Sequence, residues 1–199
     1  MRKSKFILLY AGVFVLSLLY IYSNNFNFEG RVVFNLVILF LIPYSLVLSR
    51  GESLRHYGFS LKYRREILLY TLLLLLLAVP GMLYASTLES FNNFYPIFKA
   101  AGMAEFIRFE VLLFPSFFLV EFFYRGVVLF SLKKYAGTWC ILLQAIPYFL
   151  IHIHTPSLEL VYSLFAGIFF GYVALKTESI MPTVAAHYIT SVLFDFLVW

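Results

Sequence analysis

The chain has 199 residues, of which 62% are hydrophobic, 21% aromatic and only 13% charged, and its mean hydropathy is +0.89. This composition excludes a soluble globular domain and indicates a polytopic membrane protein. The formal net charge of +5 does not indicate a nucleic-acid partner, because the basic residues lie at the ends of apolar runs, where they anchor helices and set orientation.

The first apolar run belongs to the stretch "MRKSKFILLYAGVFVLSLLYIYSNN". Its basic start is typical of a signal peptide, but the apolar part is too long and lacks a small-x-small cleavage site. We therefore expect a retained first membrane span. The single cysteine, Cys140, excludes an intramolecular disulfide.

The apolar runs that follow predict an all-α fold, a membrane helix bundle of about seven transmembrane helices. The predicted helices are 6–22, 32–49, 66–87, 108–132, 138–153, 158–175 and 180–198. No internal repeat is visible, so we expect one membrane domain, residues 1–199. Within it, residues 1–107 form N-terminal helices and an aromatic interfacial segment, and residues 108–199 form a core that carries a polar site.

Lysine and arginine positions predict the orientation of the bundle. With seven spans, eleven basic residues fall on one side: Arg2, Lys3, Lys5, Arg50, Arg55, Lys62, Arg64, Arg65, Lys133, Lys134 and Lys176. Only Arg31, Lys99 and Arg108 fall on the other side. The positive-inside rule therefore predicts a multi-pass protein with a cytoplasmic N-terminus and a C-terminus outside.

Six ionisable residues stand out within the last four predicted helices: Glu121, Arg125, His152, Glu159, His187 and Asp195. Each costs about 2.5–3.5 kcal/mol near the bilayer centre and needs a partner or a purpose. The first three predicted helices carry almost no charge between their ends. This asymmetry predicts a polar cavity in the C-terminal half.

Each of these residues also has a purely structural interpretation. Glu121 and Arg125 are four apart on one helix and can neutralise each other as packing contacts. His152 stands at a helix end before Pro156, where a histidine is usually an interfacial hydrogen bonder. Asp195 is about 12 Å along the axis from His187, so it needs a partner from another helix.

The helix 158–175 carries Ser163, Gly167 and Gly171 on one stripe. Small residues at this spacing allow two helices to approach closely in a membrane. We interpret the stripe as structural.

The polar residues occur in motifs that resemble a known family. An E-x-x-x-R-G helix, an aromatic-x-x-x-H from Tyr148 to His152, a glycine-rich helix ending "GYVALKTESIMP" and a last helix with "AAHYITS" are similar to the CPBP family, the CAAX proteases and bacteriocin-processing enzymes also called Abi. The resemblance spans roughly residues 110–199. It implies an intramembrane endopeptidase whose glutamates and histidines surround a water-filled chamber.

Two positions depart from the family pattern. The family has two adjacent glutamates, the first activating water and the second holding the arginine; aligned on Arg125, this chain has Val120 and Glu121. The last motif usually has asparagine or aspartate four residues after the histidine, where this chain has Ser191. The chain is thus similar to a family variant that lacks the first glutamate.

The residues are compatible with hydrolysis with or without a metal. A carboxylate in an apolar cavity can deprotonate water, and histidines can donate to the oxyanion or bind a metal that activates water. His152, His187 and a carboxylate would supply the ligands of a zinc site with an open position. No HExxH helix is present, so the cofactor stays open between a divalent metal such as zinc and none.

Three functions fit these observations. The first is a peptidase acting on a membrane-associated peptide or a lipidated terminus. The second is a non-catalytic relative, a membrane scaffold or immunity factor that keeps the cavity. The third is a small transporter or proton relay, although the repeated halves typical of transporters are not visible.

Glu159 is the candidate to replace the missing base. It follows His152 by seven residues and stands in the first turn of the next helix, where the helix dipole also favours a carboxylate for structural reasons. The turn at Pro156 folds the chain back, so Glu159 can point toward His152 and His187. We therefore expect Glu121, Arg125, His152, Glu159, His187 and Asp195 to form the catalytic site.

Overall fold

The computed structural model describes residues 2–199, except that the side chain of Arg2, counted above for orientation, lies outside the described part. All regular elements in this part are helical, and six stretches are long and apolar enough to cross a membrane. One of them, Met103–Leu150, contains two of the predicted helices. The all-α polytopic bundle predicted from the sequence is confirmed.

The observed helices extend most of the predicted ones by a few residues at their ends. They are α1 (Arg2–Tyr22), η1 (Ser23–Asn25), α2 (Phe28–Leu36), η2 (Val37–Leu41), α3 (Ile42–Ser49), η3 (Leu54–Tyr57), α4 (Arg64–Ala85), α5 (Glu89–Asn92), α6 (Met103–Glu121), η4 (Phe122–Val128), α7 (Leu129–Ala136), η5 (Gly137–Trp139), α8 (Cys140–Leu150), α9 (Ser157–Thr177) and α10 (Met181–Val198). The elements η2 and η4 are π-helical turns that join α2 to α3 and α6 to α7 into continuous rods.

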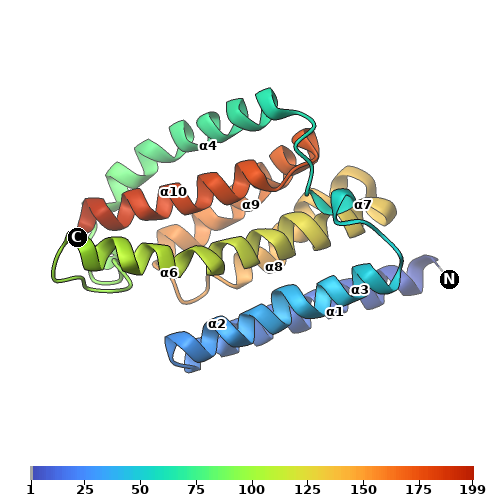
Figure 1. Cartoon of the computed structure of the whole chain (residues 1–199), viewed down its shortest axis with the longest axis horizontal. Helices are drawn as coiled ribbons and strands as arrows, with labels where there is room; N and C mark the ends of the chain where they lie inside the picture. The colour runs from blue at the N-terminus through green and yellow to red at the C-terminus, as the bar shows by residue number, and fades with distance from the viewer. Residues whose placement is uncertain (1) are drawn as a thin grey trace.

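The rods lie roughly parallel, with the two termini at opposite ends of the bundle (Figure 1). The rods α1 and α2–α3 lie together on one side, α4 and α10 lie on the other, and α6 runs between them (Figure 1). The outer face of α4 exposes a row of leucines, including Leu69, Leu72 and Leu76, as expected for a helix that faces lipid.

The helix α8 is too short to cross a bilayer. Its 11 residues rise only about 16 Å, whereas the hydrocarbon core is about 30 Å thick. The turn 151–156 after it therefore ends short of the end of the bundle that α6 and α10 reach (Figure 1). The sequence predicts a helix over 138–153, but the helix ends at Leu150, and the next residues turn inside the bundle.

The stripe predicted on α9 is the surface that packs against α8. Ser163, Gly167 and Gly171 are all buried, and the side-chain amide of Gln144 donates to the carbonyl of Gly167 over 2.7 Å. A Cβ atom on Gly171 would lie 2.7 Å from Nε2 of Gln144. The close approach predicted from small residues is confirmed.

The basic connector between α3 and α4 covers the end of the bundle at which the N-terminus lies. Glu52 accepts hydrogen bonds from Lys134 at 2.6 Å and from Tyr57, so the connector is fastened to α7. The carbonyl of Gly58 accepts from the backbone of Ile180 at 2.9 Å. Gly58 has φ of +85°, and a Cβ atom there would lie 2.6 Å from the Ile180 side chain, so this contact requires glycine.

Candidate functional site

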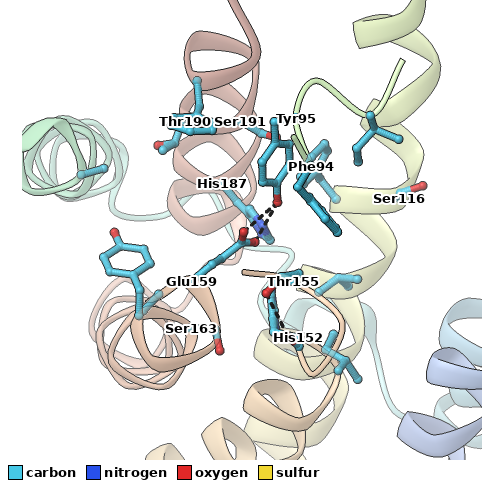
Figure 2. Close-up of a pocket in the computed structure, with 18 of the residues that line it drawn as sticks. Phe94, Tyr95, Ser116, His152, Thr155, Glu159, Ser163, His187, Thr190 and Ser191 are labelled. Atoms are coloured by element: carbon cyan, nitrogen blue, oxygen red, sulfur yellow. Dashed lines mark hydrogen bonds between the residues drawn. The ribbon is translucent and has the colours of Figure 1, made fainter. Parts of the chain in front are cut away.

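A cavity of about 670 Å³ opens between the helices of the bundle and has α1 and α2 as one wall. Three of the six predicted site residues line it, namely His152, Glu159 and His187. Figure 2 shows these three side chains around the pocket, coming from the turn after α8, from α9 and from α10. The structure therefore brings the two histidines and the candidate base into one chamber.

Glu121 and Arg125 lie behind the cavity wall and are fully buried. Oε1 of Glu121 lies 3.3 Å from Nη1 of Arg125 and 2.8 Å from Nδ1 of His187. The predicted pairing of Glu121 with Arg125 is confirmed. Because an ionised carboxylate only accepts, Nδ1 of His187 is the donor, and Nε2 is left free.

The guanidinium of Arg125 is held mainly by aromatic faces. It lies 3.7 Å from the ring centroid of Tyr148 and 5.2 Å from that of Phe170. Its nitrogens are buried and have no hydrogen-bond acceptor among the described residues, so the Glu121 charge and the rings compensate its burial. Arg125 belongs to the π-helical turn η4, a feature frequent at functional sites.

His152 is anchored through the same ring nitrogen as His187. Its Nδ1 lies 2.9 Å from the carbonyl oxygen of Tyr148, and because a carbonyl only accepts, Nδ1 carries the proton. The Tyr148 ring contacts the His152 ring at a centroid distance of 4.7 Å and the His187 ring at 6.5 Å. Tyr148 therefore contacts both imidazoles, and neither Nε2 atom has a hydrogen bond to another described residue.

Glu159 is held by a residue from outside the core. Tyr95, in the segment between α5 and α6, donates its hydroxyl to both carboxylate oxygens of Glu159, at 2.8 and 2.9 Å (Figure 2). Burial, together with the Glu159 carboxylate, raises the pKa of Tyr95 well above its ordinary value. The phenol is therefore protonated and serves as a fixed donor to the carboxylate.

Both positions that depart from the family pattern face the cavity. Val120 and Ser191 are lining residues, so an apolar side chain and a hydroxyl stand where the resemblance implies a glutamate and an amide or carboxylate. The carboxylate that remains in the first motif, Glu121, points instead to His187 and Arg125.

Asp195 is separated from the other predicted site residues. It is absent from the cavity lining and faces Glu110 of α6, with 1% and 5% of the respective residues exposed. No basic side chain among the described residues forms an ion pair with either. The geometry gives Asp195 the partner helix that its position requires and makes it a contact between α6 and α10, while the catalytic role expected for Asp195 stays a prediction.

The described residues contain no group of three histidine, cysteine, aspartate or glutamate side chains arranged to hold an ion. A ligand set for the zinc alternative is therefore not assembled in this structure.

A buried E-x-x-x-R turn that is joined to a histidine of the last helix agrees with the resemblance stated above. Residues 102–193 match the model of the type II CAAX prenyl endopeptidase Rce1-like family. The match covers α6 to most of α10 and leaves α1 to α5 outside. Comparison with curated proteins and with solved structures gives no match.

The family match confirms the resemblance inferred from the motifs and its protease character. Val120 stands where the family pattern has its first glutamate. That the chain represents a family variant without this glutamate stays a prediction.

Two residues of the site region escape sequence reasoning. Tyr95 lies in an aromatic segment that the sequence assigns to the membrane interface, and nothing in that segment singles out one tyrosine. Glu110 stands near the start of the predicted helix 108–132, where a carboxylate is unremarkable. The helix begins at Met103, so Glu110 lies about two turns inside it. A prediction that started this helix at Met103 would have identified Glu110 as a carboxylate within a membrane helix.

Proposed function

We propose that this chain is an intramembrane endopeptidase that hydrolyses a peptide bond of a membrane-associated peptide or lipidated protein terminus. One observation carries the proposal: His152, Glu159 and His187 line one cavity, and both imidazoles are anchored through Nδ1. The carboxylate and both imidazoles belong to residues 102–193, the part of the chain that matches a protease family.

Glu159 is the general base in this proposal. Its carboxylate takes a proton from water as the water oxygen attacks the scissile carbonyl carbon. The free Nε2 of His152 accepts a hydrogen bond from the second O–H of that water and so orients it. Tyr95 fixes the Glu159 carboxylate by donating to both oxygens. Glu159 then returns its proton to the leaving amine when the carbon–nitrogen bond breaks.

His187 stabilises the oxyanion. The Glu121 carboxylate at Nδ1 fixes the orientation of the ring, and Nε2 of the imidazolium form can donate to the negative oxygen. Arg125 and Glu121 are positioning residues, because they act through His187 and the Tyr148 ring and do not line the cavity themselves.

The orientation proposed for the bundle keeps the N-terminus in the cytoplasm. Most basic residues belong to the connector between α3 and α4, the last turn of α7 and the last turn of α9. These segments lie at the N-terminal end of the bundle, whereas the C-terminus lies at the other end (Figure 1). The partners that follow are membrane lipid around the bundle and a peptide in its cavity.

The test is hydrolysis of a peptide library by the purified protein in detergent, read by mass spectrometry. Wild type should cleave a subset of peptides, and His187→Ala and Glu159→Gln should each lower the rate by about 10²–10⁴-fold with unchanged folded yield. His56→Ala is the matched control, because His56 is exposed on the basic connector.

Two results would contradict the proposal. A His187→Ala variant that cleaves as fast as wild type would remove His187 from the mechanism. A well-folded wild type that cleaves no library member would favour the non-catalytic scaffold or immunity factor.

A further inference from the structure

The cavity also has polar lining residues in the part of the chain outside the family match. They are Tyr20 of α1, Asn24 of η1, and Arg31 and Asn35 of α2. Arg31 and Asn35 are four residues apart on α2, so they lie on the same face of that helix.

Arg31 has no acidic partner in the described part of the chain. No ion pair includes it, and the one hydrogen bond of its side chain to a described residue is a long contact of 3.4 Å from Nη1 to Oδ1 of Asn24. Glu29 is two residues away, which places it on a different face of the helix. Asn35 is buried, and its Oδ1 has no donor.

Arg31 is also the only lysine or arginine among the described residues that line the cavity. Its guanidinium carries a permanent charge and a planar pair of donors that match a carboxylate. Arg31 lies in the first turn of α2, and its half-buried side chain has no counter-ion among the described residues. Its position on a cavity wall indicates that the counter-ion is supplied by the ligand.

We propose that Arg31, with Asn24 and Asn35 beside it, binds a carboxylate of the peptide substrate and thereby selects which peptide bond reaches Glu159 and the two histidines. The inference rests on the proposed function, because it assumes a peptide in the cavity. An Arg–carboxylate contact fixes one point of an extended peptide, and the chain length between that point and the histidines then sets the cleavage position.

The experiment measures binding, so it does not depend on hydrolysis. Protein in nanodiscs of phosphatidylcholine is incubated with two random octapeptide libraries that differ only in a free or an amidated C-terminus, and retained peptides are quantified by mass spectrometry. Each library is made with and without Asp and Glu, which separates a terminal carboxylate from an acidic side chain. Arg31→Gln is compared with Arg108→Gln, because Arg108 is exposed and lies outside the cavity lining.

We expect wild type and Arg108→Gln to retain carboxylate-bearing peptides about tenfold better than carboxylate-free ones. Arg31→Gln should retain both sets equally, and Arg31→Lys should keep part of the preference, because the charge remains while the two-pronged donor is lost. The wild-type comparison stands alone if a variant does not fold. A binding preference without any cleavage would sustain this inference while contradicting the peptidase proposal.

Equal retention of both sets by wild type, or an unchanged preference in folded Arg31→Gln, would overturn the inference. So would a preference that disappears when phosphatidylglycerol is added to the nanodiscs, because a lipid phosphate would then occupy the site.

Discussion

At the level of single residues, the buried contact between Glu121 and Arg125 governs both stability and the state of His187. Removing one member of a buried ion pair leaves an uncompensated charge and costs about 3–5 kcal/mol. Arg125→Ala should therefore lower the thermal unfolding midpoint strongly, whereas Glu121→Gln should be milder because the amide oxygen still accepts from His187. Parallel melting of both variants in detergent checks this, and equal, negligible losses would contradict the pairing.

Val120 supports a second prediction at this scale. Its side chain faces the cavity at the position where the family resemblance implies the water-activating glutamate. Val120→Glu should raise hydrolysis above wild type if the base is the limiting group, and it should restore activity to the Glu159→Gln variant. Rates of the single and double variants on a cleaved peptide measure this. A glutamate at 120 that gives no rescue would show that the cavity lacks more than a base.

The sequence predicts single site residues where burying a charge in an apolar segment costs free energy that a partner must compensate. Charged residues inside apolar runs require partners, so Glu121, Arg125, His152 and His187 could be predicted as a group. The same argument fails for Tyr95, because an aromatic residue at an interface requires no explanation. For Asp195 it predicts the need for a partner from another helix but not the identity of Glu110, because periodicity gives the face of a helix and not the neighbour that the face meets.

At the level of helices, the contact between α8 and α9 holds the His152 turn in place. A Cβ atom on Gly167 would lie 3.1 Å from the side chains of Ala145 and Tyr148, which is closer than ordinary packing. Gly167→Ala should therefore destabilise the protein by about 1–3 kcal/mol and shift Tyr148 against His152. Gly12→Ala is the matched control, since nothing lies within 4 Å of a Cβ atom there. Equal melting midpoints of the two variants would contradict this account.

Helix boundaries show what periodicity can and cannot predict. Most of the predicted long helices are recovered within a few residues, because a membrane requires long apolar segments. The early end of α8 is different. The run 138–153 is mostly apolar up to Ile153, so only the tertiary structure, with the turn lining a cavity, explains why backbone groups leave the helix inside the bundle.

For the whole molecule, the orientation of the bundle in the membrane can be tested by a simple experiment. Basic residues concentrated at the N-terminal end predict that this end faces the cytoplasm. Alkaline phosphatase fused after Trp199 should be active, and green fluorescent protein at the same position should be dark. A C-terminal reporter that is active only in the cytoplasm would contradict this orientation.

The short helix α8 also determines how the site relates to the lipid around it. The 11 residues of α8 connect the His152 turn to the end of the bundle at which the N-terminus lies. The length of this helix therefore sets the distance of the turn from the membrane surface at that end. Lipids with longer acyl chains should leave that distance unchanged and lengthen the path from the opposite surface, through which Arg31 and Tyr95 are reached. Acyl-chain length thus becomes a control on substrate access: thicker nanodiscs should raise KM while kcat stays constant.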